Sequence, residues 1–136
     1  MRHRVSTKKL GRNTSHREAM TRNFIVSVIK HERVVTTHEK AKGMQRAVEK
    51  MMTLGKSKSP HGYRRALSAL QDKAAVAKLF DELGPRYQNR PGGCTRIVRL
   101  SGYRIGDGGS KAIFELVDNN VLAEQLAQQV DQEGEE

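Results

Sequence analysis

The sequence predicts an α+β fold: a single two-layer domain that carries an extended basic arm at its N-terminus. Helical and strand-like patterns follow one another in the order helix, strand, three helices, two strands. A Gly-rich loop joins the last two strand-like runs, which indicates a hairpin. We divide the 136 residues into an arm over 1–14, a domain over 15–118 and an acidic tail over 119–136, partly helical or disordered.

The arm and the start of the domain, residues 1–17, have the sequence MRHRVSTKKLGRNTSHR. This stretch contains six Lys or Arg side chains and no acidic one. It has too few apolar residues to offset its own ordering entropy, so we expect it to become ordered only against a large polyanion. Ammonium and guanidinium groups suit phosphates, and short polar side chains add hydrogen bonds. The candidate contacts of the arm are Arg2, His3, Arg4, Lys8, Lys9, Arg12, Asn13 and His16.

A first helix is predicted over about 15–31, because apolar residues recur four apart and share one face. That stripe consists of Met20, Phe24 and Val28. Ser15 and Glu18 fit a capping box, in which Ser15 would cap the first turn. Arg17 and Arg22 would lie on the opposite face and prolong the basic surface of the arm.

A short β-branched run predicts a strand over Arg33–Thr37. The next helix is predicted over about 38–54, and we interpret the methionines of its apolar stripe as core residues. Thr36 and Glu39 would form a second capping box at its start.

A loop over Gly55–Gly62 separates this helix from two short ones, predicted over Tyr63–Leu70 and Asp72–Leu83. Gly84 in the left-handed conformation, followed by Pro85, would end the last of them.

The hairpin is predicted to pair Thr95–Tyr103 with Lys111–Val117. Ala112, Phe114 and Leu116 would share one face of the second strand. A sheet of three strands is small, so the helices must cover one of its faces to build a common core.

The charge of the chain favours a polyanionic partner. Up to Val117 there are 25 basic and 9 acidic residues, whereas from Asp118 onward there are 6 acidic and no basic ones. Nucleic acid is the first candidate and an anionic membrane the second. The membrane is less favoured because no apolar run approaches the roughly 20 residues that span a bilayer. The N-terminus lacks the apolar core of a secretory signal. A mitochondrial targeting peptide is also rich in Arg and poor in acidic residues, so composition leaves that alternative open. The arm has few apolar residues to form the amphipathic helix of such a peptide.

No motif indicates catalysis, a metal or a cofactor. The five histidines and the single cysteine, Cys94, form none of the local pairs that are typical of zinc sites. The Gly-rich loops match no phosphate-binding motif, and no nucleophile signature frames a serine. We therefore expect neither an enzyme nor a small-molecule substrate. One cysteine cannot form an intramolecular disulfide and suits a reducing cytoplasm.

A second basic surface is predicted around the hairpin, in addition to that of the arm. Its members are Arg86, Arg90, Arg96, Arg99 and Arg104. Because aromatic residues are scarce, we expect recognition of the backbone and shape of folded RNA rather than base stacking.

The residues also resemble the L-seventeen family of bacterial large-subunit ribosomal proteins, in order over residues 1–118. The tail departs from the pattern, as do Pro91 and Cys94. The resemblance is carried by MRHR, Gly11–Arg17, Ala19-Met20, Arg22-Asn23, Thr36-Thr37, Lys40-Ala-Lys42, Val76–Phe80, Leu83–Tyr87, Arg90, Gly92-Gly93, Thr95–Ile97, Gly106-Asp107 and Glu115–Val117.

This resemblance implies a structural component of the large ribosomal subunit in the cytoplasm, without catalysis or cofactor. It implies binding to large-subunit ribosomal RNA near the peptide exit side, beside neighbouring ribosomal proteins, in support of translation. It also implies a three-stranded mixed sheet, and it adds Lys42 to the candidate RNA contacts.

Two alternatives remain at this point. The chain could be a free nucleic-acid-binding module, such as an architectural DNA binder or an RNA chaperone. It could also be an RNA-processing enzyme, which would need a convergent pocket of carboxylates or of Cys and His.

Overall fold

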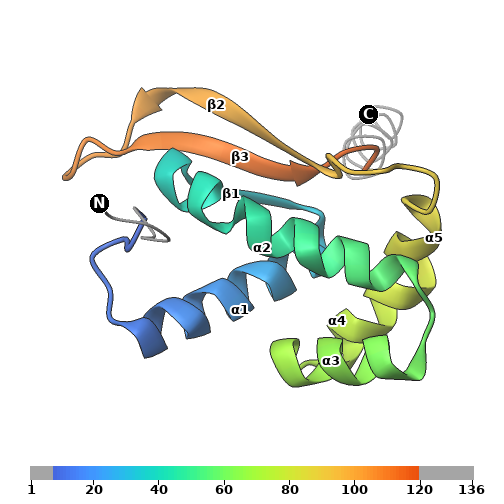
Figure 1. The fold of residues 1–136 in the computed structure, drawn as a ribbon. Helices are drawn as coiled ribbons and strands as arrows, with labels where there is room; N and C mark the ends of the chain where they lie inside the picture. The colour runs from blue at the N-terminus through green and yellow to red at the C-terminus, as the bar shows by residue number, and fades with distance from the viewer. Residues whose placement is uncertain (1–7, 120–136) are drawn as a thin grey trace, which may run out of the picture.

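Helices cover one face of a small sheet in the computed structural model, which describes residues 8–119 (Figure 1). The helix α2 lies directly against the sheet, and α1, α3 and α4 lie farther from it. The predicted two-layer order of helix, strand, three helices and hairpin is confirmed. In chain order the elements are α1 (Thr14–His31), β1 (Arg33–Thr37), α2 (His38–Lys56), α3 (Pro60–Leu70), α4 (Lys73–Lys78), the π-helical turn η1 (Leu79–Leu83), α5 (Gly84–Arg86), β2 (Thr95–Tyr103) and β3 (Ser110–Leu116).

The sheet has the order β1-β3-β2, and both strand pairs are antiparallel. The mixed sheet that the resemblance implied is therefore wrong. The strands β1 and β2 do run in the same direction, but β3 lies between them, so no parallel pair forms. Val34, Phe114 and Ile97 stand opposite one another across the three strands and contribute to the core.

The core forms between the helices and the inner face of the sheet. Ala112, Phe114 and Leu116 are fully buried, as their predicted shared face requires. The ring of Phe24 on α1 meets that of Phe114 edge to face, with centroids 5.1 Å apart. The methionine stripe of α2 is core, as predicted, through Met44 and Met52. Within residues 8–119, no helix is long and apolar enough to cross a bilayer.

Both predicted capping boxes are wrong. Asn13, not Ser15, caps α1, because its Oδ1 accepts a hydrogen bond from the backbone N of His16 (2.9 Å). Helix α2 begins after Thr37, whose side chain makes no capping bond, and Glu39 pairs with Lys8 instead. The loop after α2 is also shorter than predicted, since α2 continues to Lys56 and α3 begins at Pro60.

Gly84 does not end a helix in the left-handed conformation. Its φ of −55° and ψ of −56° are helical, and the chain continues through η1 into α5. A Cβ on Gly84 would collide with the carbonyl oxygen of Gly55 at the end of α2. Glycine is required here because two backbones approach closely, not because φ is positive.

Candidate nucleic-acid interface

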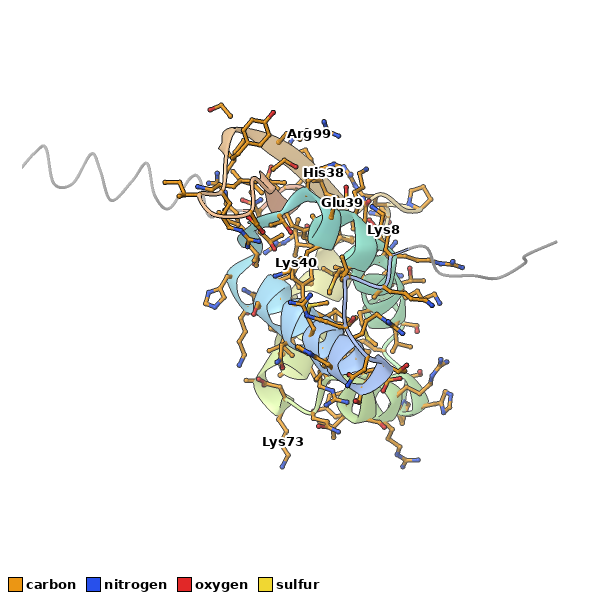
Figure 2. All side chains as sticks on the ribbon, turned by 90° about the vertical axis from the view of Figure 1, so that its left-hand side faces the viewer. Lys8, His38, Glu39, Lys40, Lys73 and Arg99 are labelled. Atoms are coloured by element: carbon orange, nitrogen blue, oxygen red, sulfur yellow. The ribbon has the colours of Figure 1, made fainter. Side chains whose placement is uncertain are left out.

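The base of the arm lies against the start of α2. Lys8 Nζ forms an ion pair with Glu39 Oε2 at 3.0 Å, and both residues lie on the end of the molecule that Figure 2 faces. A Cβ on Gly43, one turn farther along α2, would lie 3.7 Å from Leu10 Cδ1. These contacts hold residues 8–10 against the start of α2. The predicted contacts Arg2, His3 and Arg4 lie outside the described residues.

A tight turn connects the arm to α1. The backbone N of Arg12 donates to the Lys9 carbonyl (3.2 Å), and Leu10 and Gly11 between them both have positive φ, 54° and 62°. Asn13 then caps α1, and His16 is exposed in its first turn. Among these predicted contacts, Lys9 is an exposed cation in the turn. Asn13 uses its Oδ1 to cap the helix, so this oxygen is already hydrogen-bonded.

The arginines at the start of α1 are held by backbone carbonyls. Arg17 Nη1 donates to the Arg12 carbonyl (3.2 Å), and Arg22 Nε donates to the Ala69 carbonyl of α3 (3.0 Å). Arg12 Nη1 in turn donates to the Leu10 carbonyl (2.8 Å). A carbonyl orients a guanidinium group without neutralising its charge, so these three cations keep their attraction for phosphates.

A row of cations on α2 continues this surface. Lys42, Arg46 and Lys50 are exposed and follow one another four residues apart, so they share one side of the helix. We predicted only Lys42; the same spacing in the sequence was the available signal for the other two. With Arg17, Arg22 and Arg65 they make up what we call the helical basic face: Arg17, Arg22, Lys42, Arg46, Lys50 and Arg65.

Two shallow hollows shape this face. One, of about 510 Å³, opens between α1, α2 and α3 and is lined by Arg17, Arg22 and Lys50, and also by the exposed Glu18, which forms no ion pair with them. The other, of about 700 Å³, is lined by Lys50, Arg46 and Arg65. Glu49, which also lines the second hollow, accepts hydrogen bonds from the backbone N and the hydroxyl of Thr95 (3.0 and 2.6 Å). Within residues 8–119 no acidic side chain forms an ion pair with any member of the helical basic face.

The arginines predicted around the hairpin are not brought together. Arg86 belongs to α5, at the opposite end of the sheet from the hairpin tip (Figure 1). Most of the group is paired: Arg86 with Glu32 (2.5 Å), Arg90 with Asp118 (3.5 Å), Arg96 with Glu115 (2.5 Å) and Arg104 with Asp107. Arg99 is exposed near the tip and has no acidic partner among the described residues.

Glu32 is the centre of the strongest of these pairings. It follows α1 in the left-handed conformation (φ 58°) and is 6 % exposed. Arg86 and Lys78 both contact its carboxylate, Lys78 at 3.1 Å. Burial alone would raise the pKa of Glu32, but the hydrogen bonds and charges of Arg86 and Lys78 outweigh it, so the pKa lies below its ordinary value of 4.5. These cations serve the fold.

Catalytic groups do not converge in the described part of the chain. Residues 8–119 contain no group of three or more His, Cys, Asp or Glu side chains that could hold a metal ion. Cys94 is buried, and burial raises the pKa of its thiol.

Comparison with known proteins places these features in a wider group. The family model "Ribosomal protein L17" matches residues 20–117. The chain is similar to the large ribosomal subunit protein bL17 of Syntrophotalea carbinolica, with 48% identity over 118 residues, which cover 87% of this chain and 76% of the relative. It is equally similar to the large ribosomal subunit protein bL17 of Trichlorobacter lovleyi, with 49% identity over 118 residues, covering 87% and 94%.

Proposed function

We propose that this chain, which belongs to the ribosomal protein L17 family of the large ribosomal subunit, binds and stabilises folded large-subunit ribosomal RNA. Membership makes it a structural constituent of the bacterial-type ribosome in the cytoplasm rather than an enzyme. From the resemblance we also propose a position near the peptide exit side, beside other proteins of the subunit. Crosslinking in assembled subunits, with the RNA and protein sites mapped, tests that position.

The observation that supports RNA binding is the lack of acidic partners on the helical basic face. A solvated protein surface normally mixes charges of both signs, which lets its cations pair internally. Here six cations on three packed helices have no ion-pair partner among the described residues. The arm, which contains no acidic residue, adds further cations at the start of α1. Each phosphate contact releases condensed counterions, so many weak contacts add up to firm binding.

The geometry favours recognition of a folded RNA. The cations stand on helices that pack against one another, and Arg22 joins α1 to α3 through the Ala69 carbonyl. Charges on such a rigid frame suit a fixed pattern of phosphates, whereas a flexible basic segment would accept any polyanion. Arg2, Arg4, Lys8, Lys9 and Arg12 would then extend along neighbouring RNA from the turn before α1.

Salt titration tests the helical basic face. We compare the wild type with the triple variant Arg17→Gln, Arg46→Gln, Lys50→Gln for binding to protein-free large-subunit RNA. The slope of log K against log salt should fall by about 2 to 3 units, since each lost phosphate contact removes close to one.

The matched control removes three cations outside this face, with Lys30→Gln, Lys58→Gln and Lys73→Gln. Both triple variants have the same net charge. If they lower the slope equally, bulk charge and not the helical basic face governs binding. If the wild type itself binds other RNAs and DNA as tightly, the chain is a general nucleic-acid binder.

Deletion of residues 2–7 tests the arm while it spares the contact between Lys8 and Glu39. The deleted variant should enter large subunits with reduced occupancy, and it should be lost from them in a moderate-salt wash that the wild type survives. Undiminished occupancy after sedimentation would rule out an anchoring role for the first residues of the arm.

A further inference from the structure

The tip of the β2–β3 hairpin exposes large apolar side chains. The hairpin extends past the start of α2, away from the helices (Figure 1). Tyr103 is 73 % exposed, Ile105 is fully exposed, and Leu100 nearby is 37 % exposed. Isolated apolar residues are common on protein surfaces, but three within six residues at a protruding tip indicate a contact surface.

A bulge sets the tip at an angle to the rest of β2. Arg99 stands opposite Ala112, and the next paired residue, Tyr103, stands opposite Ser110. Three residues of β2 therefore face one of β3, and Gly102 among them has a φ of +85°, which favours glycine. Bulges of this kind redirect side chains at the ends of sheets.

The loop beyond the bulge is held by its own hydrogen bonds. Arg104 Nε donates to Asp107 Oδ1 (2.8 Å), and the Gly109 backbone N donates to the same oxygen (3.2 Å). The Arg104 backbone N donates to the Gly109 carbonyl (2.9 Å). Because the loop is already ordered, binding at Tyr103 and Ile105 pays little additional entropy.

A cationic hollow lies beside this loop. It has a volume of about 280 Å³ and no acidic side chain among its lining residues. Lys40 and Lys111 line it together with the hydroxyl-bearing Thr36 and Thr37, and so does Arg104, whose guanidinium group is paired with Asp107. Ammonium, guanidinium and hydroxyl groups are the side chains that hold phosphate oxygens. Figure 2 shows Lys40 on the same end of the molecule as Arg99.

We propose that the hairpin tip holds an unpaired nucleotide of RNA, with the base against the ring of Tyr103 and the phosphate in the hollow beside Lys40 and Lys111. This inference rests on the proposed RNA binding and adds base stacking, which the scarcity of aromatic residues had argued against. Tyr103 directly precedes Arg104, which lines the hollow, so one loop carries both an exposed aromatic ring and the edge of a cationic hollow. This combination suits a splayed nucleotide, whose base and phosphate separate. A protein partner would match the apolar side chains but not Lys40 and Lys111, which have no acidic partner among the described residues.

Tyr103→Trp tests the stacking directly. The chain has no tryptophan, so the variant carries a single fluorophore at the tip. Its fluorescence should be strongly quenched when full-length protein binds protein-free large-subunit RNA. The control is Tyr63→Trp, at a 39 % exposed position on α3 where the ring packs 5.6 Å from Phe80; its fluorescence should change little. An unquenched tryptophan at position 103 in a bound complex would overturn the proposal.

Affinity provides a second readout. Tyr103→Ser should weaken RNA binding by about 5- to 150-fold, the usual range for one stacked base, and leave the salt slope unchanged. Tyr103→Phe should keep the wild-type affinity. Equal affinity of Tyr103→Ser and the wild type overturns the inference while RNA binding stands, whereas a wild type that fails to bind overturns the proposed function. If Tyr103→Ser instead loses a crosslink to a ribosomal protein and none to RNA, the tip is a protein contact and the proposal is wrong.

Discussion

Two groups of arginines in this molecule have different surroundings. Arg86, Arg96 and Arg104, in the C-terminal half, each contact a carboxylate. Arg17 and Arg22, on α1, instead donate to backbone carbonyls. The first group is neutralised within the fold, and the second keeps its charge for a partner. The density of positive charge in the sequence therefore does not distinguish cations that are free to meet a partner from cations that are paired within the fold; the position of the acidic side chains does.

The difference follows from where the acidic residues lie. Glu32 and Glu115 are buried and surrounded by cations, because a buried carboxylate without a partner would be costly. Glu115 contacts Arg96 on one side and Arg33 at 3.9 Å on the other. These cations compensate the charge of the buried carboxylates and are not free to bind phosphates.

The largest expected effect is on stability, in Glu32→Ala. This variant leaves Arg86 and Lys78 half-buried without their carboxylate and should lower the free energy of unfolding by about 3 kcal/mol. Urea denaturation measures the loss, and the exposed Glu18→Ala is the control, with a change within about 0.5 kcal/mol. At a temperature where Glu32→Ala is folded, its RNA-binding salt slope should equal that of the wild type. A higher slope would mean that Arg86 and Lys78 also bind RNA once their carboxylate is removed.

The next effect appears on acidification. The pKa of Glu32 is lowered in the folded state, so its contribution to stability is present above the ordinary value of 4.5 and is lost as the pH falls through the folded value. Wild-type protein should therefore lose more free energy of unfolding between pH 7 and pH 2 than Glu32→Gln, which cannot titrate at this position. Parallel curves for the two proteins, from denaturation at each pH, would contradict the assigned role of Glu32.

The smallest effect compares two arginines three residues apart on β2. Arg99→Gln should reduce the salt slope of RNA binding by about one unit, because Arg99 has no acidic partner in the described part of the chain. Arg96→Gln should leave the slope nearly unchanged, since Glu115 already neutralises Arg96. Instead it should lower the free energy of unfolding by about 1 kcal/mol, because the buried Glu115 loses one of its two arginine partners. The reverse result would show that internal pairing does not predict which cations face RNA.

Local patterns in the sequence were sufficient for the order of the elements. The strand Arg33–Thr37 has the predicted bounds, because a short run of β-branched residues between two helices favours the extended conformation. The caps were less predictable, since Asn13 and Ser15 are both good N-cap residues and the turn before α1 decides between them. Gly84 shows the same limit: a left-handed cap and a close backbone contact both require glycine, and only the position of Gly55 distinguishes them.

The candidate site was predictable in part. The row Lys42, Arg46 and Lys50 can be found from helical spacing alone, although we had named only its first member. The pairing of Arg86 with Glu32 could not be predicted from a local pattern, because 54 residues separate them in the chain. The sequence predicted Tyr103 only as the last residue of a strand. Its exposure depends on a bulge in β2 that no local sequence pattern predicted.

The order of the sheet also determines when the protein can fold during its own synthesis. The strand β3 is the last element of the domain to be made, yet it lies between β1 and β2 and provides every inter-strand pairing. Until it emerges, the two older strands have no partner, and the inner face of the sheet has no Phe114 to meet the helices. Assembly of the sheet is thus a late, long-range event that follows the synthesis of the basic arm and α1.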